Sequence, residues 1–241
     1  MKKIETHLKG RKYILFIDFE GTQFSHEMIA IGAVLATLDK KNRIKSLKEP
    51  FKVYVKAKNK IGNYVTELTK ITEEMLKKEG VSFNEALLSL KKYLGTKWRK
   101  SLFVTYGNHD MRILNQSIAY NFQYPKDFCS QFHKSYWDFA AFLSDFLRDE
   151  KGNPYSLVRS CELFNVEVAE PTHDPRSDAI NLARLYDAFI ANYDIVHENY
   201  KRAIVYTHHL PEPLKMVVDK LNKGETITPE IYDELIKEYL K

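Results

Sequence analysis

The stretch that most constrains the fold is YILFIDFEGT, at Tyr13–Thr22. It starts with five apolar residues in a row, a pattern typical of a strand buried in the middle of a sheet. The apolar run leads into Asp18 and Glu20, and because side chains alternate along a strand, both carboxylates face the same way, about 7 Å apart along the chain. Two like charges in this arrangement repel each other unless a cation lies between them. The stretch therefore predicts a central strand that ends in a pair of acids, and this pair is either a solvated strand end or a cation-binding pair.

Two further segments in the first third of the chain have strand patterns. The segment MIAIGAVLA, at 28–36, is continuously apolar, and the segment FKVYV, at 51–55, alternates. We expect the polar stretch LDKKNRIKS, at 38–46, to form the turn region between them. Because the connections between these strands are short, an antiparallel meander is expected.

The second part of the chain alternates strand and helix patterns. Ser82 and Glu85 form a capping-box pattern, and the helix that they open is expected to stop at Gly95. Asp174 and Pro175 suit the N-cap and the first position of a later helix. Further strands are predicted at 102–107 and near 133–138, and further helices at 111–121, 139–147 and 156–164.

These elements predict an α/β fold with a mixed five-stranded sheet and helices on both faces. The chain of 241 residues is long enough for one such domain with an appendage. We place the domain at residues 1–193. Residues 194–241 are polar and end in a helix pattern at 228–241. We interpret them as a C-terminal helical extension that packs on the domain or on the second subunit of a homodimer.

Composition limits the compartment and the partners. No apolar run approaches the roughly 20 residues that a membrane helix needs, and the N-terminal stretch has no signal-peptide core. Cys129 and Cys161 are the only cysteines and neither belongs to a CxxC pair, so neither a disulfide framework nor a cysteine zinc site is expected. We therefore expect a cytoplasmic protein with no membrane partner. The formal net charge of +5 permits a nucleic-acid partner without requiring one, because the basic residues are scattered.

Three more titratable residues stand at the ends of predicted elements. Asp110 follows the fourth predicted strand and opens a helix, Asp178 lies in the first turn of the helix that starts at Pro175, and His173 precedes that helix. Each residue alone has an ordinary explanation, because acids are common at helix starts and a histidine among prolines is common in loops. Together with the acid pair of the first strand they form a specific pattern. Hard oxygen ligands of this kind suit Mg²⁺ or Mn²⁺.

Three segments resemble the three sequence motifs of the DEDDh 3′-to-5′ exonucleases: FIDFEGT at 16–22, TYGNHDMRIL at 105–114 and HDPRSDAINLARLY at 173–186. This family has a ribonuclease-H-like fold and includes ribonuclease T and polymerase proofreading subunits. The form of the motifs is most similar to the branch of histone-mRNA and RNA-interference exonucleases. The resemblance covers most of the chain, from about residue 11 to residue 193.

The resemblance implies hydrolysis of phosphodiester bonds at the free 3′ ends of single-stranded RNA or DNA, with RNA slightly favoured, and release of nucleoside 5′-monophosphates. It implies two divalent cations, Mg²⁺ or Mn²⁺, with Asp18 as a ligand of both. Glu20 and Asp178 would hold the ion beside the attacking water, and Asp110 would support the second ion. His173 would be the general base, since a histidine with a pKa near neutrality can accept a proton. Four carboxylates also balance the charge of two dications.

The resemblance implies contacts to the terminal nucleotide as well. The backbone around Gly21 and Thr22 would approach this nucleotide. The segment ELTKIT, at 67–72, is similar to the segment of the family that touches the terminal sugar and base. In it, Leu68 would be an apolar wedge and Thr69 a hydroxyl partner.

For other polar and aromatic residues in or near the motifs, two roles are possible. Asn108 and Asn181 match polar positions of the family, where they would orient ligands or substrate, and a capping role is the alternative. Phe24 is placed where it could stack on a base. In a chain with 14 Phe we expect it to be packed instead.

Two alternative functions stay open. The HD doublets at 109–110 and 173–174 are the signature of metal-dependent HD phosphohydrolases, but that fold is all helical and would leave Asp18 and Glu20 unexplained. The other alternative is a catalytically silent exonuclease fold that only binds nucleic acid. Loss of activity usually replaces a metal ligand, whereas all five expected residues are present here.

Overall fold

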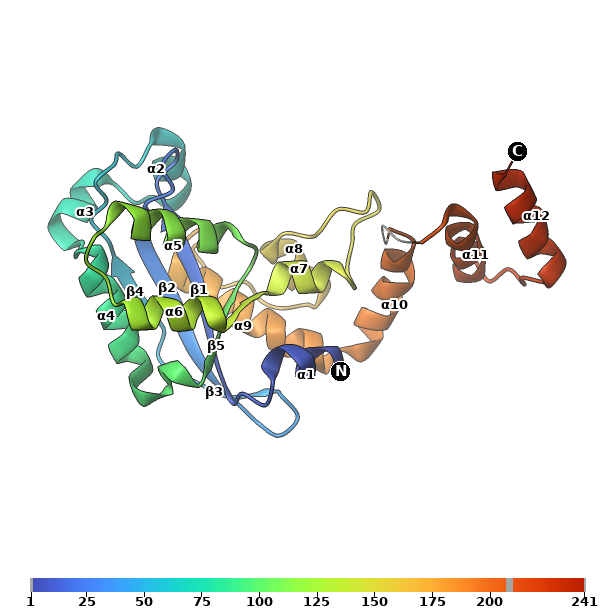
Figure 1. Cartoon of the computed structure of the whole chain (residues 1–241), viewed down its shortest axis with the longest axis horizontal. Helices are drawn as coiled ribbons and strands as arrows, with labels where there is room; N and C mark the ends of the chain where they lie inside the picture. The colour runs from blue at the N-terminus through green and yellow to red at the C-terminus, as the bar shows by residue number, and fades with distance from the viewer. Residues whose placement is uncertain (1, 207–209, 241) are drawn as a thin grey trace. The chain divides into compact units, whose positions relative to one another are not determined.

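The computed structural model describes residues 2–206 and 210–240 and contains a mixed sheet with helices (Figure 1). Within this part of the chain six strands form one sheet in the order β3-β2-β1-β5-β6, and β4 also pairs with β2. The strands are β1 Tyr13–Gly21, β2 Met28–Leu38, β3 Ile44–Leu47, β4 Phe51–Tyr54, β5 Ser101–Thr105 and β6 Tyr136–Asp138. The predicted α/β class and the central place of the first strand are confirmed.

The directions of the strands decide which side chains meet. β1 is antiparallel to β2, and β2 is antiparallel to β3 and β4, as the predicted meander requires. β1, β5 and β6 are parallel to one another. The carboxyl ends of these three strands therefore lie at the same end of the sheet, which is where α/β folds collect their functional groups.

The predicted number of five strands is wrong, because β3 begins inside the stretch that was expected to be a turn. Its four residues, Ile44–Leu47, are half-buried or exposed and include Lys45 and Ser46. A short edge strand of this kind is held by its backbone ladder to β2, for example at Ala36 opposite Leu47, and it has no apolar pattern that a sequence could reveal.

Helices cover both faces of the sheet, as predicted; in Figure 1, α5 and α6 lie in front of the sheet and α9 lies behind it. The alternation of β1 explains the two layers. Leu15, Ile17 and Phe19 belong to the core shared with α4, α5 and α6, whereas Phe16 on the opposite face contacts Tyr186 of α9. The helices are α1 Lys2–Leu8, α2 Asn63–Thr69, α3 Glu73–Glu79, α4 Phe83–Leu94, η1 Gly95–Arg99, α5 His109–Tyr120, α6 Lys126–Lys134, α7 Phe139–Ser144, α8 Leu157–Leu163, α9 Pro175–Ala191, α10 Tyr193–Ala203, η2 Ile204–Tyr206, α11 Glu212–Asn222 and α12 Pro229–Tyr239.

The helix starts that the sequence predicted are confirmed at two places. Ser82 and Glu85 form both hydrogen bonds of a capping box at the start of α4. At the start of α9, Oδ1 of Asp174 accepts hydrogen bonds from the backbone amides of Arg176 and Ser177, and Pro175 is the first helical residue. The last predicted helix, 228–241, is observed as α12, and residue 241 lies outside the described residues.

A glycine lets α9 approach the sheet closely enough to deliver its first turn to β1. A Cβ atom added at Gly32 of β2 would lie 1.9 Å from the backbone C and O atoms of Pro175 and 2.3 Å from the backbone N of Arg176. No side chain fits into this space. The position of the first turn of α9 therefore depends on the absence of a side chain at Gly32.

The Gly32→Ala variant is expected to be less stable than the wild type by about 3 kcal/mol or more, because the added methyl group collides with backbone that cannot rotate away. For a protein of this size, such a change lowers the melting temperature by roughly 6 to 12 °C. Thermal unfolding followed by circular dichroism measures it. An unchanged melting temperature would show that α9 can shift outward without cost.

The chain divides into two compact units. One comprises Met1–Phe139 with Leu157–Ala191 and holds the whole sheet, and the other comprises Ala140–Ser156 with Asn192–Lys241. In the second unit, Phe146 contacts Phe142 and Tyr200 through their rings. The domain boundary at residue 193 and the role of 194–241 stay predictions. Among the described helices, none has the length and apolar character needed to cross a bilayer.

Candidate active site

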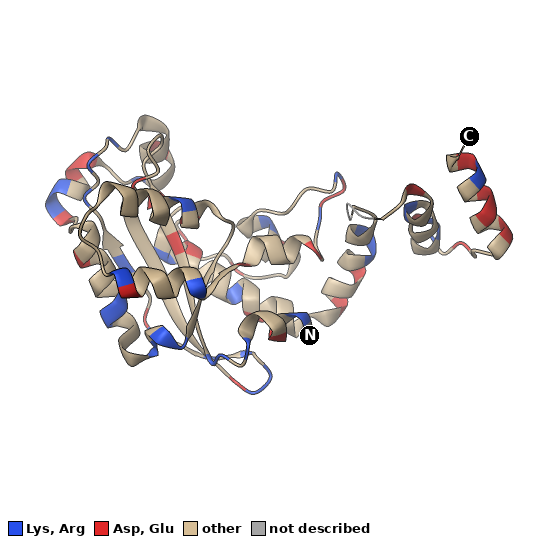
Figure 2. Ribbon diagram, in the orientation of Figure 1, with Lys and Arg blue, Asp and Glu red and all other residues tan. Residues whose placement is uncertain are grey.

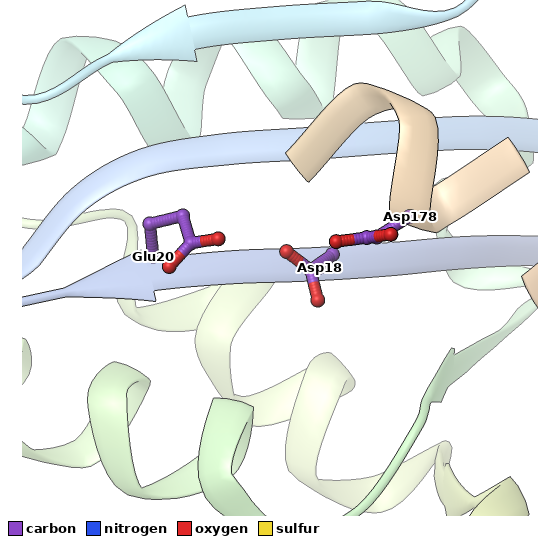
Figure 3. Close-up of side chains that lie close together, drawn as sticks. All are labelled: Asp18, Glu20 and Asp178. Carbon is purple, nitrogen blue, oxygen red and sulfur yellow. The ribbon is translucent and has the colours of Figure 1, made fainter. Parts of the chain in front are cut away.

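Three carboxylates converge at the carboxyl end of β1 (Figure 3). Asp18 and Glu20 project from one face of β1, and Asp178 projects toward them from the first turn of α9. One carboxylate oxygen of each residue lies within 4.8 Å of the others. The expectation that the two acids of β1 share a face is therefore met. The third carboxylate comes from α9, the helix that can approach the sheet because Gly32 has no side chain.

Asp110 approaches β1 from α5 and stands apart from the group of three. Its side chain is only 5% exposed, and its Oδ1 accepts a hydrogen bond of 2.7 Å from the backbone amide of Phe19. Since Phe19 lies between Asp18 and Glu20, this bond fixes the Asp110 carboxylate beside the strand segment that carries the two acids. The structure thus brings four predicted acids to one strand end, and ligand atoms of three of them lie within 4.8 Å of one another.

The electrostatics of the site show a shortage of positive charge. Burial, followed by repulsion from the neighbouring carboxylates, raises the pKa of Asp18 well above its ordinary value and the pKa of Glu20 to about 8. Burial raises the pKa of Asp110 to about 7 and also raises the pKa of Asp178. Oxygen donors alone, crowded and partly shielded from water, fit hard divalent cations such as Mg²⁺ or Mn²⁺, whose charge would offset the repulsion.

These raised pKa values predict that the metal-free protein loses stability as the pH rises. A carboxyl group whose pKa is higher in the folded state keeps its proton there, so its ionisation above the unfolded pKa opposes folding. For Glu20 the loss should develop between about pH 5 and pH 8, while the half-buried His26 and the exposed His109, whose pKa values are lowered, act in the opposite direction. The Glu20→Gln variant should therefore show a smaller decrease of melting temperature than the wild type over this range in chelator. Equal decreases in both proteins would contradict the placement of Glu20.

His173 lies in the turn that precedes α9, with an exposed side chain and a left-handed backbone (φ 61°). Histidine is one of the residues that tolerate this conformation more often than most. The charge of its imidazole and a hydrogen bond from its backbone amide both counteract the effect of burial on the pKa of Asp178. His173 is thus beside Asp178 but does not belong to the group of three carboxylates.

The residues expected to contact a terminal nucleotide have structural roles of their own. Gly21 is buried, and a Cβ atom there would lie 2.8 Å from the side chain of Ile113. Thr22 is 1% exposed, and its hydroxyl bonds with Ser25 and accepts from the backbone amide of Glu27. Both residues shape the loop that leaves β1, and their contact with substrate stays a prediction.

The segment with Leu68 and Thr69 forms the end of α2, which begins next to the same loop. The backbone amide of Gln23 donates to the carbonyl of Ile61, and Gly62, the N-cap of α2, lies against the Gln23 side chain. Leu68 is 36% exposed, whereas the Thr69 hydroxyl donates to the carbonyl of Val65 within the helix. A free apolar side chain at Leu68 is compatible with the predicted wedge, which no contact in the structure tests.

Three further expectations can be compared with the structure. Asn108 is the N-cap of α5, but its side chain makes no capping hydrogen bond, so the capping explanation is wrong for it. Asn181 is fully buried, accepts from the backbone amide of Ala169 and places its Nδ2 3.5 Å from Oδ1 of Asp178. Phe24 is 82% exposed, so the expectation that it is packed is wrong.

Two charged residues near the carboxylates were missed in the sequence. Asp138, the last residue of β6, accepts a hydrogen bond of 3.0 Å from the backbone amide of Gly107, and its charge helps to raise the pKa of Asp110. Lys52 of β4 forms an ion pair with Asp174 and lowers the pKa of Glu20 against the effect of burial. Lys52 and Asp138 lie near the carboxylates because of the register in which β4 and β6 pair with their neighbours. A local sequence pattern does not determine this register.

The comparison with known families separates the exonuclease interpretation from the HD phosphohydrolase alternative. The family model described as Exonuclease, RNase T, matches residues 15–186, which include all four acids and His173. The chain belongs to the RNase T exonuclease family. The expectation drawn from the DEDDh motifs is therefore confirmed, and the chain carries a nuclease domain. The HD phosphohydrolase alternative is wrong, since a six-stranded sheet is incompatible with an all-helical fold.

Solved structures of other exonucleases have a similar fold. The nuclease domain of 3′hExo, a DEDDh family member bound to rAMP, is 22% identical, with a TM-score of 0.59 over 77% of this chain and 93% of that chain. A 3′-exonuclease that recognises the histone mRNA stem-loop is 19% identical, with a TM-score of 0.59 over 76% and 82% of the two chains. E. coli Exonuclease I with a dA16 oligonucleotide is 18% identical, with a TM-score of 0.56. The match covers 86% of the present chain and 45% of the Exonuclease I chain. No curated protein matched the sequence.

Proposed function

We propose that the protein is a metal-dependent 3′-to-5′ exonuclease that hydrolyses single-stranded nucleic acid, with RNA slightly favoured, and releases nucleoside 5′-monophosphates. The observation that carries the proposal is the group of Asp18, Glu20 and Asp178, whose ligand atoms lie within 4.8 Å of one another in a domain of the exonuclease family. Their crowding is costly without a cation and useful with one.

Four carboxylates would hold two divalent cations, Mg²⁺ or Mn²⁺. Asp18, which is repelled by all three other acids, would help to hold both ions. Glu20 and Asp178 would hold the ion on the side of the attacking water, and Asp110, fixed by the Phe19 amide, would support the other. When bound, such ions polarise the phosphodiester and stabilise the charge on its attacking and leaving oxygens.

His173 would remove the proton from the attacking water. Its exposed side chain is accessible to water and substrate, and its turn is attached to Asp178 through the backbone amide. A positioned base of this kind contributes about 10² to 10⁴-fold to the rate. The carboxylate of Asp178 nearby would stabilise the imidazolium that forms.

The substrate end would lie beside the loop that leaves β1. Phe24 in this loop and Leu68 near the end of α2 offer exposed apolar surface, suited to packing against a terminal base. Among similar proteins, one is described with rAMP and another with a DNA oligonucleotide, so the proposal includes both sugars.

The test uses 5′-labelled single-stranded RNA and DNA of equal sequence, incubated with Mn²⁺, with Mg²⁺ and with chelator. We expect a ladder that shortens from the 3′ end only when metal is present, faster on RNA. Release of the 5′ label as a mononucleotide without labelled intermediates, or shortening in chelator, would contradict the mechanism. No shortening with any metal would favour a silent binding module.

A further inference from the structure

One row of the sheet joins an acid of the active site to a lysine. Asp18 of β1 is opposite Gly32 of β2, and Gly32 is opposite Lys52 of β4. Residues opposite each other in a sheet project from the same face, so Asp18 and Lys52 flank the gap that Gly32 leaves. The backbone of Pro175 fills this gap. The first turn of α9 therefore lies between an acid on one side and a base on the other.

Lys52 uses this position to hold the start of α9. Its Nζ forms an ion pair with Oδ2 of Asp174, and the side chains of the two residues are only 21% and 12% exposed. The other oxygen of the same carboxylate accepts from the backbone amides of Arg176 (2.9 Å) and Ser177 (3.3 Å). One carboxylate thus links β4 to the N-terminus of α9, with little water to weaken the pair.

We propose that Lys52 is a positioning residue for His173, acting through its ion pair with Asp174. This inference rests on the proposed role of His173 as the general base. His173 immediately precedes Asp174 and adopts a left-handed backbone, so the direction of its side chain depends on how firmly the next residue is held. Lys52 holds Asp174 from the sheet, and the amides of α9 hold it from the helix.

A competing role for Lys52 makes different predictions. Its charge also reaches Glu20, so Lys52 could act on the carboxylates or on a substrate phosphate without any help from Asp174. In that case the loss of Lys52 and the loss of Asp174 would have independent effects. If the pair acts as a unit, removing either partner removes the whole effect, and a double-mutant cycle separates the two cases.

The kinetic test compares Lys52→Met, Asp174→Asn and the double variant in the 3′-shortening assay. Asn keeps the oxygen that caps α9, so Asp174→Asn removes the ion pair alone. We expect each single variant to lower kcat by roughly 10 to 10²-fold with KM nearly unchanged, as for a misplaced catalytic group. The double variant should be no slower than the slower single variant, and Lys52→Arg should recover most of the rate. Multiplied losses in the double variant, or a raised KM with normal kcat, would overturn the proposal.

A structural measurement keeps this proposal separate from the proposed reaction. In chelator and without substrate, the backbone amides of Arg176 and Ser177 should exchange with deuterium at least about 10-fold faster in Lys52→Met than in the wild type, because the cap is no longer held. The matched control is Lys45→Met, an exposed lysine of β3 in the same sheet, which should leave exchange and rate unchanged. If the wild type fails to hydrolyse nucleic acid, the proposed function falls while the exchange result still decides whether Lys52 holds the turn. Equal exchange in Lys52→Met and wild type would overturn the positioning role.

Discussion

The Asp18→Asn variant is expected to lose hydrolysis by roughly 10³-fold or more while it remains folded. The charges of the other three acids all raise the pKa of Asp18, and on the proposed mechanism its loss would remove a ligand of both ions and several kcal/mol of transition-state stabilisation. Asn has nearly the same shape, so the site changes in charge but not in volume. The measurement is the rate of 3′ shortening at saturating Mn²⁺, with Asp145→Asn, a change at an exposed acid outside the site, as the control.

The same substitution should make the metal-free protein more stable at neutral pH. The pKa of Asp18 is raised in the folded state, so its ionisation opposes folding at every pH above its unfolded value, and Asn removes that penalty. The stability difference from the wild type should disappear only toward about pH 3, below the unfolded pKa of about 3.9, where the wild-type group is protonated in both states.

Metal binding should reverse the order of stability. With Mn²⁺ at about 100 times its dissociation constant, the wild type should gain about 2.7 kcal/mol, or roughly 5 to 10 °C in melting temperature. Asp18→Asn should gain much less. A variant that unfolds, or one that keeps both activity and the Mn²⁺ shift, would remove Asp18 from the proposed site.

The His173→Ala variant is expected to lower kcat by roughly 10² to 10⁴-fold, the usual contribution of a general base. The Mn²⁺ concentration that gives half-maximal activity should change little, because His173 is not one of the three converging ligands. This separation of rate from metal requirement distinguishes a base from a ligand. His197→Ala, which removes an exposed histidine of the second unit, provides the control.

The outcome of His173→Ala also tests the turn that carries it. Alanine tolerates a positive φ poorly, so part of the effect could come from a rearranged turn. His173→Asn accepts this backbone and removes the base. If Asn restores the rate, the backbone of the turn matters and the imidazole does not, which would contradict the proposed role.

The parts of the site that depend on local pattern were accessible from the sequence. The alternation of β1 places Asp18 and Glu20 on one face, and the cap at Asp174 starts the helix that carries Asp178. Both follow from periods of a few residues. The resemblance to the family motifs indicates that these separate segments contribute to one site.

The parts that depend on pairing between distant strands were not accessible. β3 has no apolar period, and its place follows from the ladder with β2. Lys52 becomes relevant only because its strand aligns it with Gly32, and Asp138 only because β6 is parallel to β5. The exposure of Phe24 depends on the shape of a loop, which composition does not determine.

The division of the site between β1 and α9 has a consequence during synthesis. Asp18 and Glu20 leave the ribosome early, but Asp178 follows roughly 10 to 30 s later at ordinary elongation rates of about 5 to 20 residues per second. Until then the nascent chain lacks one of the three carboxylates whose ligand atoms converge. On the proposed mechanism, the nascent chain cannot degrade the message from which it is being translated until Asp178 has emerged.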